Sequence, residues 1–358
     1  MEEKKVIRVG SRKSHLAMIQ TNWIVDKLKE QNPEQLFEII GISTTGDKIL
    51  DVALSKIGEK SLFTKELELA LLNNEIDFVV HSLKDLPTQL PDGLTIAAIT
   101  KREDPRDAVL FSPKTEAKNL KDLPSGSCIG TSSLRRVAQL RKHYPHLNFI
   151  DVRGNLNTRL KKLDDPDGPY SALILATAGV SRMGWLDRIG QYLESEDCMH
   201  AVGQGALGIE CAEDNEPILS LLNSLNHPST HLQCLAERSF MRTLEGGCSV
   251  PVAVSTSIQH SKRESQEDEF RLVLKGSVWN LDGSKSVIHE INCDVGRSST
   301  IDDAESCFKL TSVYLRTFPG YHAQAVNASA HLGRKLGEVL LGLGAKDILD
   351  EVKAETSK

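Results

Sequence analysis

Four short segments of the sequence combine charged, hydroxylic or sulfur-bearing residues in patterns that could support chemistry. The first, His81-Ser82-Leu83-Lys84-Asp85-Leu86-Pro87, follows an apolar, strand-like run. A lysine beside an aspartate at the end of a strand could place a carboxylate within a positive field in a cleft. The alternative is that Asp85 only caps the turn before Pro87, and that His81 is an ordinary strand-end histidine.

The second segment, Gly130-Thr131-Ser132-Ser133-Leu134-Arg135-Arg136, indicates an anion site. Small hydroxylic residues at a strand-to-helix junction expose backbone N–H groups at a helix N-terminus, and two adjacent arginines add charge-assisted donors. The segment lacks the Gly-Lys-Ser/Thr ending of a phosphate-binding P-loop, so nucleotide phosphate is not specified. A solvated helix face is the alternative interpretation.

The third segment, Asp151-Val152-Arg153-Gly154-Asn155-Leu156-Asn157-Thr158-Arg159, adds two more arginines. Arg153 lies at a strand end, and Arg159 shares a helix face with Asn155, four residues earlier. Arg12, at the first strand-to-helix junction, and Arg182 could join them. Each arginine alone is typical of a surface, but several strand ends carrying arginine or lysine favour a shared anion site.

The fourth segment, Leu244-Glu245-Gly246-Gly247-Cys248-Ser249-Val250-Pro251, could expose a sulfur atom. Two glycines permit backbone conformations with positive φ that would present Cys248 on a loop. The alternative is that Cys248 is a small buried apolar residue. No partner motif for a cysteine protease is evident.

Composition excludes several classes of protein. The 358 residues predict two or three domains, and 40% hydrophobic with 26% charged residues is typical of globular proteins. Residues 131–162 hold eight basic residues and one acid, a charge of +7 in a chain of −6, which indicates a local anion site and no nucleic-acid surface. Seven scattered cysteines without a CxxC pair argue against disulfides and structural zinc, and favour a cytoplasmic protein. Neither a membrane span nor a signal peptide is expected.

The elements that must position these residues form two tandem α/β units. Strands are expected at 6–10, 37–42, 77–81, 95–100, 127–131, 149–152, 172–176 and 206–211, with helices between most of them. This alternation predicts parallel sheets in two lobes, and ligands bind beyond the carboxyl ends of such strands. Antiparallel strands at 250–258, 270–279 and 287–293 and a helix at 323–343 predict a smaller α+β domain.

Taken together, the segments resemble the porphobilinogen deaminases, also called hydroxymethylbilane synthases, of the animal type. The resemblance covers nearly the whole chain and also includes Gly10-Ser11-Arg12-Lys13-Ser14, Ser43-Thr44-Thr45-Gly46-Asp47, Phe63-Thr64-Lys65-Glu66-Leu67 and Gly203-Gln204-Gly205-Ala206-Leu207-Gly208. It implies two lobes like those of periplasmic binding proteins (1–102 with 203–226, and 103–202) and a C-terminal α+β domain (227–358). The polar stretch at 296–306 departs most from the bacterial pattern.

The resemblance also implies the activity. Four porphobilinogen molecules are joined head to tail on a dipyrromethane primer, with loss of ammonia, and water releases hydroxymethylbilane for tetrapyrrole and haem biosynthesis. Cys248 would hold the primer through a thioether, and Asp85 would act near the pyrrole nitrogens. Primer binding is expected from Lys84, Ser132, Ser133, Arg135, Arg136 and Gly205. Substrate binding is expected from Arg12, Ser14, Gln20, Phe63, Arg153, Arg159 and Arg182. A monomer without metal, nucleic-acid or membrane partners is expected.

Two other classes of function are alternatives to the synthase activity. A cleft lined by arginine between two lobes could belong to an anion-binding or regulatory module without catalysis. Such a receptor has no use for an acid in the cleft, as Asp85 would be, or for a tethered cysteine such as Cys248. Nucleic-acid binding is disfavoured because the basic window lacks interleaved aromatic residues.

The role of Cys248 is tested by replacement. Cys248→Ala should fold, turn over no substrate and lack the additional mass of two pyrrole units in intact-protein mass spectrometry. The other six cysteines should be dispensable when they are replaced one at a time. A fully active Cys248→Ala protein would exclude the tether.

Overall fold

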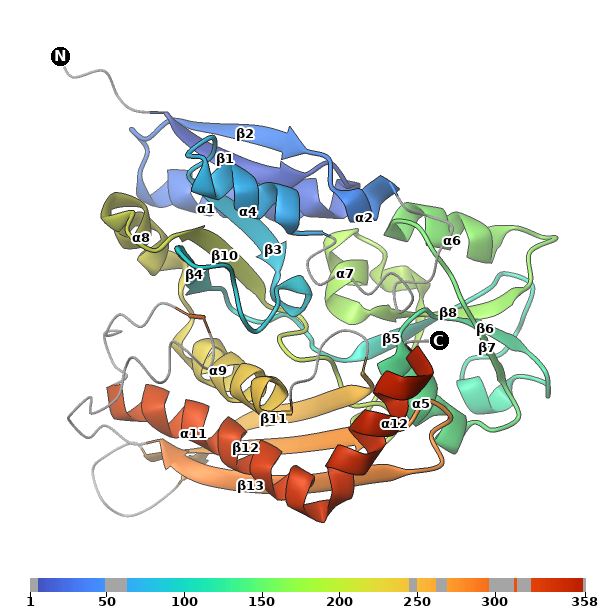
Figure 1. The fold of residues 1–358 in the computed structure, drawn as a ribbon. Coiled ribbons are helices and arrows are strands. Elements are labelled where there is room, and N and C mark those ends of the chain that lie inside the picture. The colour runs from blue at the N-terminus through green and yellow to red at the C-terminus, as the bar shows by residue number, and fades with distance from the viewer. Residues whose placement is uncertain are drawn as a thin grey trace.

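The computed structural model describes residues 6–48, 63–244, 250–261, 269–295, 312–313 and 323–356. Within them lie two five-stranded sheets and one three-stranded sheet (Figure 1). Cys248 and the polar stretch at 296–306 fall outside the described residues. Of the helices in the described ranges, none combines the length and the apolar character that a bilayer crossing requires.

The first sheet, with its helices, is called lobe 1. Its strands follow the order β2-β1-β3-β10-β4. Helices α1 and α8 cover one face of this sheet, and α4 and α9 cover the other. Side chains of β3 alternate between these faces, so that Phe78 and Val80 pack under α1 whereas Val79 packs under α4. The bounds are β1 (Ile7–Arg12), α1 (His15–Gln31), β2 (Phe37–Ile42), α2 (Thr45–Lys48), α4 (Lys65–Leu72), β3 (Phe78–Ser82), β4 (Leu94–Ile99), β10 (Leu207–Ala212) and α8 (Glu216–Leu222). Helix α9 (Pro228–Thr243) covers this sheet but belongs to the third domain described below.

The second sheet, with its helices, is called lobe 2 and repeats this plan. Its strands follow the order β7-β6-β8-β5-β9. Leu140 of α5 packs on one face, while Leu163 of α6 and Val180 of α7 pack on the other. The bounds are β5 (Asp107–Phe111), β6 (Cys128–Gly130), α5 (Leu134–His143), β7 (Asn148–Ile150), α6 (Leu156–Asp164), β8 (Tyr170–Ala176), α7 (Thr177–Arg182) and β9 (Ile189–Leu193).

The prediction of parallel sheets is wrong for one strand in each lobe. Strand β10 runs antiparallel to β3 and β4, and β5 runs antiparallel to β8 and β9. Both strands come directly after the chain crosses from one lobe to the other. The chain enters each lobe from the side that faces the other lobe, so β10 starts at the sheet edge where β1, β3 and β4 end, and β5 starts at the edge where β6 and β8 end.

The first helix is capped by Ser14 and not by Ser11, the other serine at this strand-to-helix junction. Ser11 lies within β1, where its hydroxyl donates to the Arg12 carbonyl and accepts from Thr21. Helix α1 is capped by Ser14, whose hydroxyl accepts the Ala17 N–H at 3.4 Å. Ser14 suits this position because it precedes the first helical residue and can satisfy an otherwise unpaired N–H group.

The third sheet builds a separate α+β domain. Its strands β11 (Val252–Ser261), β12 (Glu269–Trp279) and β13 (Ser286–Val295) form an antiparallel meander. Helix α11 (Ala323–Leu340) packs closely on α9 and leads through a π-helical turn (Leu341–Ala345) into α12 (Lys346–Thr356) (Figure 1). Their apolar residues continue the core beneath α4 of lobe 1. The predicted fold class, two α/β lobes with a small α+β domain, is confirmed.

A buried ion pair ties the crossings between the lobes to the third domain. Arg102, just after β4, donates from both terminal nitrogens to the Glu237 carboxylate on α9, each at 2.7 Å. The same carboxylate accepts the Gly203 N–H at 2.7 Å and a hydrogen bond from Thr256 on β11. Burial alone would raise the pKa of Glu237, but the charge and hydrogen bonds of Arg102 lower it to about 2.

Glu237→Gln should therefore destabilise the protein by about 3–5 kcal/mol, because it leaves the Arg102 charge buried without a counter-charge. Chemical denaturation measures the loss. The pKa of Glu237 is depressed in the folded state, so its contribution is complete above about pH 5 and fades as the pH falls towards 2. The matched control is Glu30→Gln, in the exposed pair with Lys27, which should cost less than about 1 kcal/mol. Equal losses in the two variants would contradict the role given to this pair.

Candidate active site

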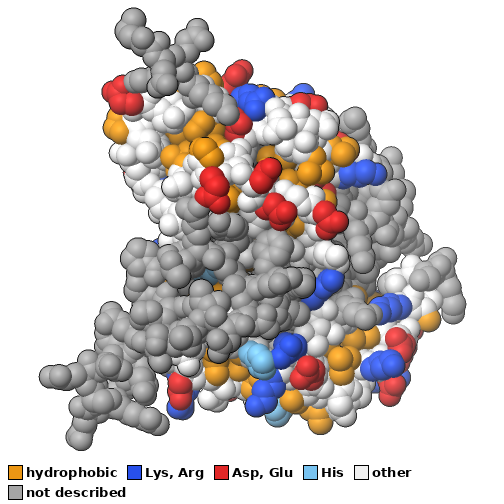
Figure 2. Space-filling view, turned by 60° about the vertical axis from the view of Figure 1, so that its left-hand side comes forward, with side chains coloured by type: hydrophobic (Ala, Val, Ile, Leu, Met, Phe, Trp, Pro, Cys, Tyr) orange, Lys and Arg blue, Asp and Glu red, His pale blue; other side chains and the backbone are white. Residues whose placement is uncertain are grey.

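A cleft opens where the strand ends of both lobes meet. It encloses about 1310 Å³ of non-protein space, counted out to its solvent-filled mouth. Among the described residues that line it, six are arginine or lysine and one, Asp85, is acidic. On the face shown in Figure 2, several acidic side chains lie near one another in the upper half, and most of the basic ones lie in the lower half. In the lining of the cleft, by contrast, positive charge predominates. The six basic residues are Arg12, Lys84, Arg136, Arg153, Arg159 and Arg182.

The wall from lobe 1 carries four of the predicted substrate residues. The Arg12 guanidinium lies 4.3 Å from the centre of the Phe63 ring, a cation–π contact that orients it. Gln20 is buried on α1 and donates to the Ser82 hydroxyl at 3.0 Å. Ser14 lines the cleft while it caps α1. The cleft therefore brings Arg12, Ser14, Gln20 and Phe63 together.

Lys84 and Asp85 end a 3₁₀ turn, Leu83–Asp85, that follows β3 directly. Lys84 donates to the Gln204 side chain at 3.4 Å. Its pKa is lowered to about 8, first by burial and further by Arg136, although Asp85 opposes the shift. The Asp85 carboxylate accepts no hydrogen bond from the described residues, so no capping contact supports the turn alternative. The Asp85 carboxylate is exposed to the cleft.

Several arginines lie close together on the side of the cleft that lobe 2 forms. Arg159 donates its Nε hydrogen to the Gly154 carbonyl at 2.8 Å, and Arg182 donates to the Gly205 carbonyl at 2.7 Å. Burial, followed by the charges of Arg136 and Arg153, lowers the pKa of Arg159 to about 10. Burial also lowers the pKa of Arg182. The neighbouring positive charges that contribute to the lowered pKa of Arg159 also attract anions to this wall.

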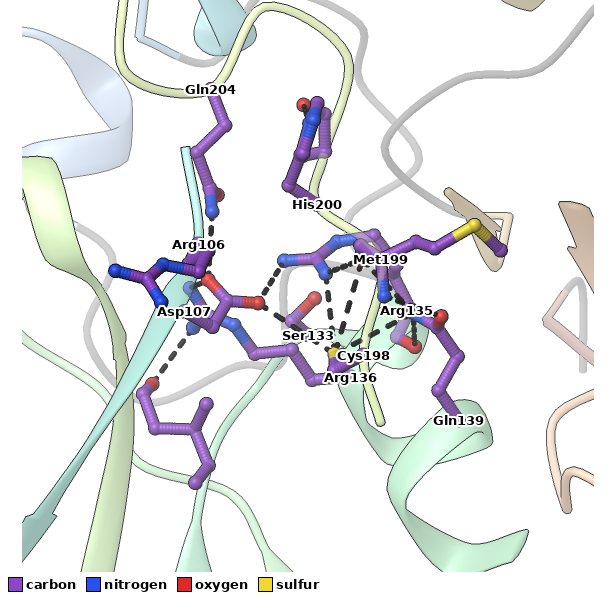
Figure 3. A network of polar contacts seen from close by, with 12 residues as sticks. Arg106, Asp107, Ser133, Arg135, Arg136, Gln139, Cys198, Met199, His200 and Gln204 are labelled. Carbon is purple, nitrogen blue, oxygen red and sulfur yellow. Dashed lines mark hydrogen bonds and ion pairs between the residues drawn. The ribbon is translucent and has the colours of Figure 1, made fainter. Parts of the chain in front are cut away.

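Arg135 and Arg136 share one buried aspartate, which the sequence analysis missed. Asp107, the first residue of β5, accepts from Arg135 and from Arg136 at 2.8 Å each, and from Gln204 at 2.8 Å (Figure 3). Arg135 also donates to the Met199 carbonyl at 2.5 Å. Burial would raise the pKa of Asp107, but the two guanidinium charges hold it far below its usual range. The only local feature of the sequence that could have indicated Asp107 is its place as a single acidic residue at the start of an apolar run.

This network separates the predicted primer residues. Arg136 lines the cleft. Arg135 is not among the lining residues and donates instead to Asp107 and to the Met199 carbonyl. Ser132 bonds the backbone of Val152, and Ser133 lies at the N-cap of α5; neither is among the lining residues.

Gly205 lines the cleft at a point where only glycine fits. Its φ of +94° lies in the left-handed region, and a Cβ there would be 2.5 Å from the Glu103 carbonyl oxygen. The cleft thus brings Gly205 close to Arg182, which bonds its carbonyl.

Asp107→Asn tests whether the two buried arginines depend on one carboxylate. The change should cost about 3–5 kcal/mol of unfolding free energy, because two guanidinium groups lose their counter-charge. Arg135→Met should recover part of this loss when combined with Asp107→Asn, since it removes one of the uncompensated charges. Denaturation of both single variants and the double variant measures the coupling, and Asp164→Asn in the exposed Arg188 pair is the control. Strictly additive losses would rule out the dependence.

Two family models match this chain. The model described as "Porphobilinogen deaminase, dipyromethane cofactor binding domain" matches residues 7–220, which span both lobes. The model described as "Porphobilinogen deaminase, C-terminal domain" matches residues 231–313. The matched residues make up well over half of the chain.

Curated relatives match over nearly the full length. The porphobilinogen deaminase of Nostoc sp. is 48% identical over 355 residues, covering 99% of this chain and 97% of the relative. That of Dictyostelium discoideum is 48% identical over 349 residues, covering 97% and 96%. Relatives of this length thus occur in cyanobacteria as well as in a eukaryote.

Solved structures resemble the two lobes more distantly. The methionine-binding protein MetQ covers 62% of this chain with 15% identity and a TM-score of 0.40, a similarity too low to inform on ligand or activity. The family models and the full-length relatives carry the assignment instead. On their evidence the chain belongs to the porphobilinogen deaminase family, the hydroxymethylbilane synthases of tetrapyrrole biosynthesis.

Proposed function

We propose that this chain performs the hydroxymethylbilane synthase reaction in the cleft between its lobes, with Asp85 as the catalytic carboxylate. The observation that supports this most directly is the composition of the lining, six basic residues around one exposed acid. A site that only binds anions gains nothing from a carboxylate among its arginines, because that carboxylate repels the ligand. A site that must also stabilise a developing cation needs one.

The dipyromethane cofactor of the family fits the described residues. Two buried guanidinium nitrogens, Arg136 Nε and Arg153 Nη1, have no hydrogen-bond partner within the described ranges. Unpaired buried donors are costly, and carboxylates are the natural partners of guanidinium groups. Arg136, Arg153 and Lys84 would therefore hold the acidic side chains of the cofactor, and Gly205 would let it approach the backbone. When bound, the cofactor supplies the pyrrole carbon on which the product chain is started. Its proposed attachment point, Cys248, lies outside the described residues.

The arginines would bind the substrate through its carboxylates. Each porphobilinogen carries an acetate and a propionate, and a hydrogen bond to a charged group contributes about 1.5–3 kcal/mol. Arg12, Arg153, Arg159 and Arg182 face the same cleft from two lobes, so they can hold one ring while the next one arrives. Binding should also recover the free energy that now depresses the pKa of Arg159, since an anion stabilises its charged form.

Asp85 would act on the reacting centre. Departure of ammonia from the aminomethyl group leaves positive charge on the pyrrole, and a fixed carboxylate stabilises that charge as it develops. The same carboxylate can accept the proton that the attacking pyrrole carbon loses. Lys84, beside Asp85 and with a pKa of about 8, would be charged at neutral pH.

We further propose the organisation of the whole molecule. Residues 1–102 with 203–226 form lobe 1, residues 103–202 form lobe 2, and residues 227–358 form the third domain. The sheets support this division, because β10 returns to the sheet of β1 to β4. A cytoplasmic monomer is proposed by similarity to the family, and the five described cysteines, all free thiols, fit a reducing compartment.

Asp85→Asn and Asp85→Glu test the catalytic assignment. Asp85→Asn keeps the side-chain volume but removes the charge, so kcat should fall by at least about 10²–10⁴-fold. Asp85→Glu keeps the charge and should retain more activity. If Asp85 only capped the turn before Pro87, asparagine would be nearly neutral and glutamate the worse variant. Ammonia release and bilane formation measure the rates, with thermal melts to confirm folding. Near-normal turnover in Asp85→Asn would falsify the assignment.

A further inference from the structure

A buried cluster of two acids and a histidine lies behind Asp85. His81 on β3 and Glu210 on β10 are joined by a 2.9 Å contact between Nε2 and Oε2, and Glu210 is completely buried. Gly208 stands opposite His81 in the antiparallel pair, so Glu210 reaches the imidazole diagonally along the same face. Glu68, buried on α4, covers this face and feels the charges of both. None of these three residues has a role in the site described above.

The cluster is incompletely satisfied. One carboxyl oxygen of Glu68 and one of Glu210 are buried without a hydrogen-bond partner among the described residues. Each such atom costs about 1–3 kcal/mol, so its retention needs an explanation. The described side chains do not come together as a metal-ligand set. Apolar residues at these positions would fill the core without the free-energy cost of burying unpaired polar atoms.

A second, smaller cavity connects this cluster to the reaction site. It contains about 410 Å³ of non-protein space and adjoins the main cleft, with which it shares Arg12 and Asp85. Thr64 and His81 line it as well. This space is counted out to its solvent-filled mouth, so waters can enter between the Asp85 carboxylate and the imidazole. The Thr64 hydroxyl, beside Glu68, offers one more partner for such waters.

We propose that His81, Glu210 and Glu68 form a proton relay that serves Asp85 through this cavity. In each condensation the C–N bond of an aminomethyl group breaks and a C–C bond forms between its methylene and a pyrrole carbon. The pyrrole carbon loses a proton, and the departing amine leaves as ammonia. The relay takes up the proton from Asp85 and returns one to the departing amine. In the overall reaction, an aminomethylpyrrole and a pyrrole C–H are converted to a methylene-bridged product and ammonia. His81 and Glu210 are thus positioning and relay residues.

The charges around the cluster suit this role. Glu66 and Glu68 face it from α4, Arg238 from α9 and Arg12 across the cavity. Burial, and after it the nearby Glu210 charge, raises the pKa of Glu68 against the opposing effect of Thr64. The protonated form of Glu68 is therefore favoured in this buried site, beside the His81–Glu210 contact.

Kinetics of His81→Asn and Glu210→Gln test the relay, which rests on the proposed role of Asp85. Both variants should lower kcat about tenfold or more with little change in KM, alter the pH profile of kcat and enlarge its solvent deuterium isotope effect. The matched control is His231→Asn, which also removes a fully buried imidazole but lies on α9, away from this cavity. It should change stability without changing the isotope effect. Wild-type pH profiles and isotope effects in both relay variants would overturn the proposal.

Infrared spectroscopy of the full-length protein supplies a readout that is independent of turnover. A protonated carboxyl band should persist to higher pH than those of exposed acids and disappear in Glu68→Gln, a variant mild enough to fold if the other two do not. In Glu210→Gln the band should be lost at lower pH, because removal of the Glu210 charge lowers the pKa of Glu68. A spectrum that is the same in wild type and Glu68→Gln would also overturn the relay.

The relay and the proposed role of Asp85 can fail separately. A fully active Asp85→Asn protein would exclude both the proposed role of Asp85 and the relay. An inactive Asp85→Asn protein, together with His81→Asn and Glu210→Gln variants of normal kcat, removes the relay alone.

Discussion

The contact between Asp107 and two arginines is the constraint on which the cleft depends. One fully buried carboxylate compensates two guanidinium groups and also accepts a hydrogen bond from Gln204, which itself holds Lys84. Strand β5 of lobe 2, helix α5 and the segment returning to lobe 1 therefore meet at one point (Figure 3). Because a buried charge tolerates little displacement, this contact fixes the positions of Arg136 and Lys84 in the cleft.

Under the proposed function, crowded positive charge would make the cleft selective for anions. Burial lowers the pKa of Lys84, Arg159 and Arg182, and neighbouring arginines lower the pKa of Lys84 and of Arg159 further. The carboxylates of a growing polyanion would offset the repulsion between these cations, whereas a neutral ligand would not.

Local patterns predicted much of this structure, and long-range pairing accounts for what they missed. Strand β2 was predicted to the residue, because a short, largely apolar run marks it. Strand β5 has only four apolar residues after Asp107, and β9 is interrupted by glycine and glutamine, so periodicity could not reveal them. The arginine pair at 135 and 136 was visible, but its partner lies 28 residues earlier, and Glu210 lies 129 residues from His81. No local pattern encodes such distances.

The place of β10 in the first sheet has a consequence for synthesis on the ribosome. This strand lies between β3 and β4, yet all of lobe 2 is translated before it. Until residue 212 has emerged, β4 has no neighbour within its sheet and β3 has an open edge. Unpaired strand edges are templates for association with other chains. The nascent protein is therefore most vulnerable to misassembly during translation of lobe 2, and a chaperone that shields this edge would act in that interval.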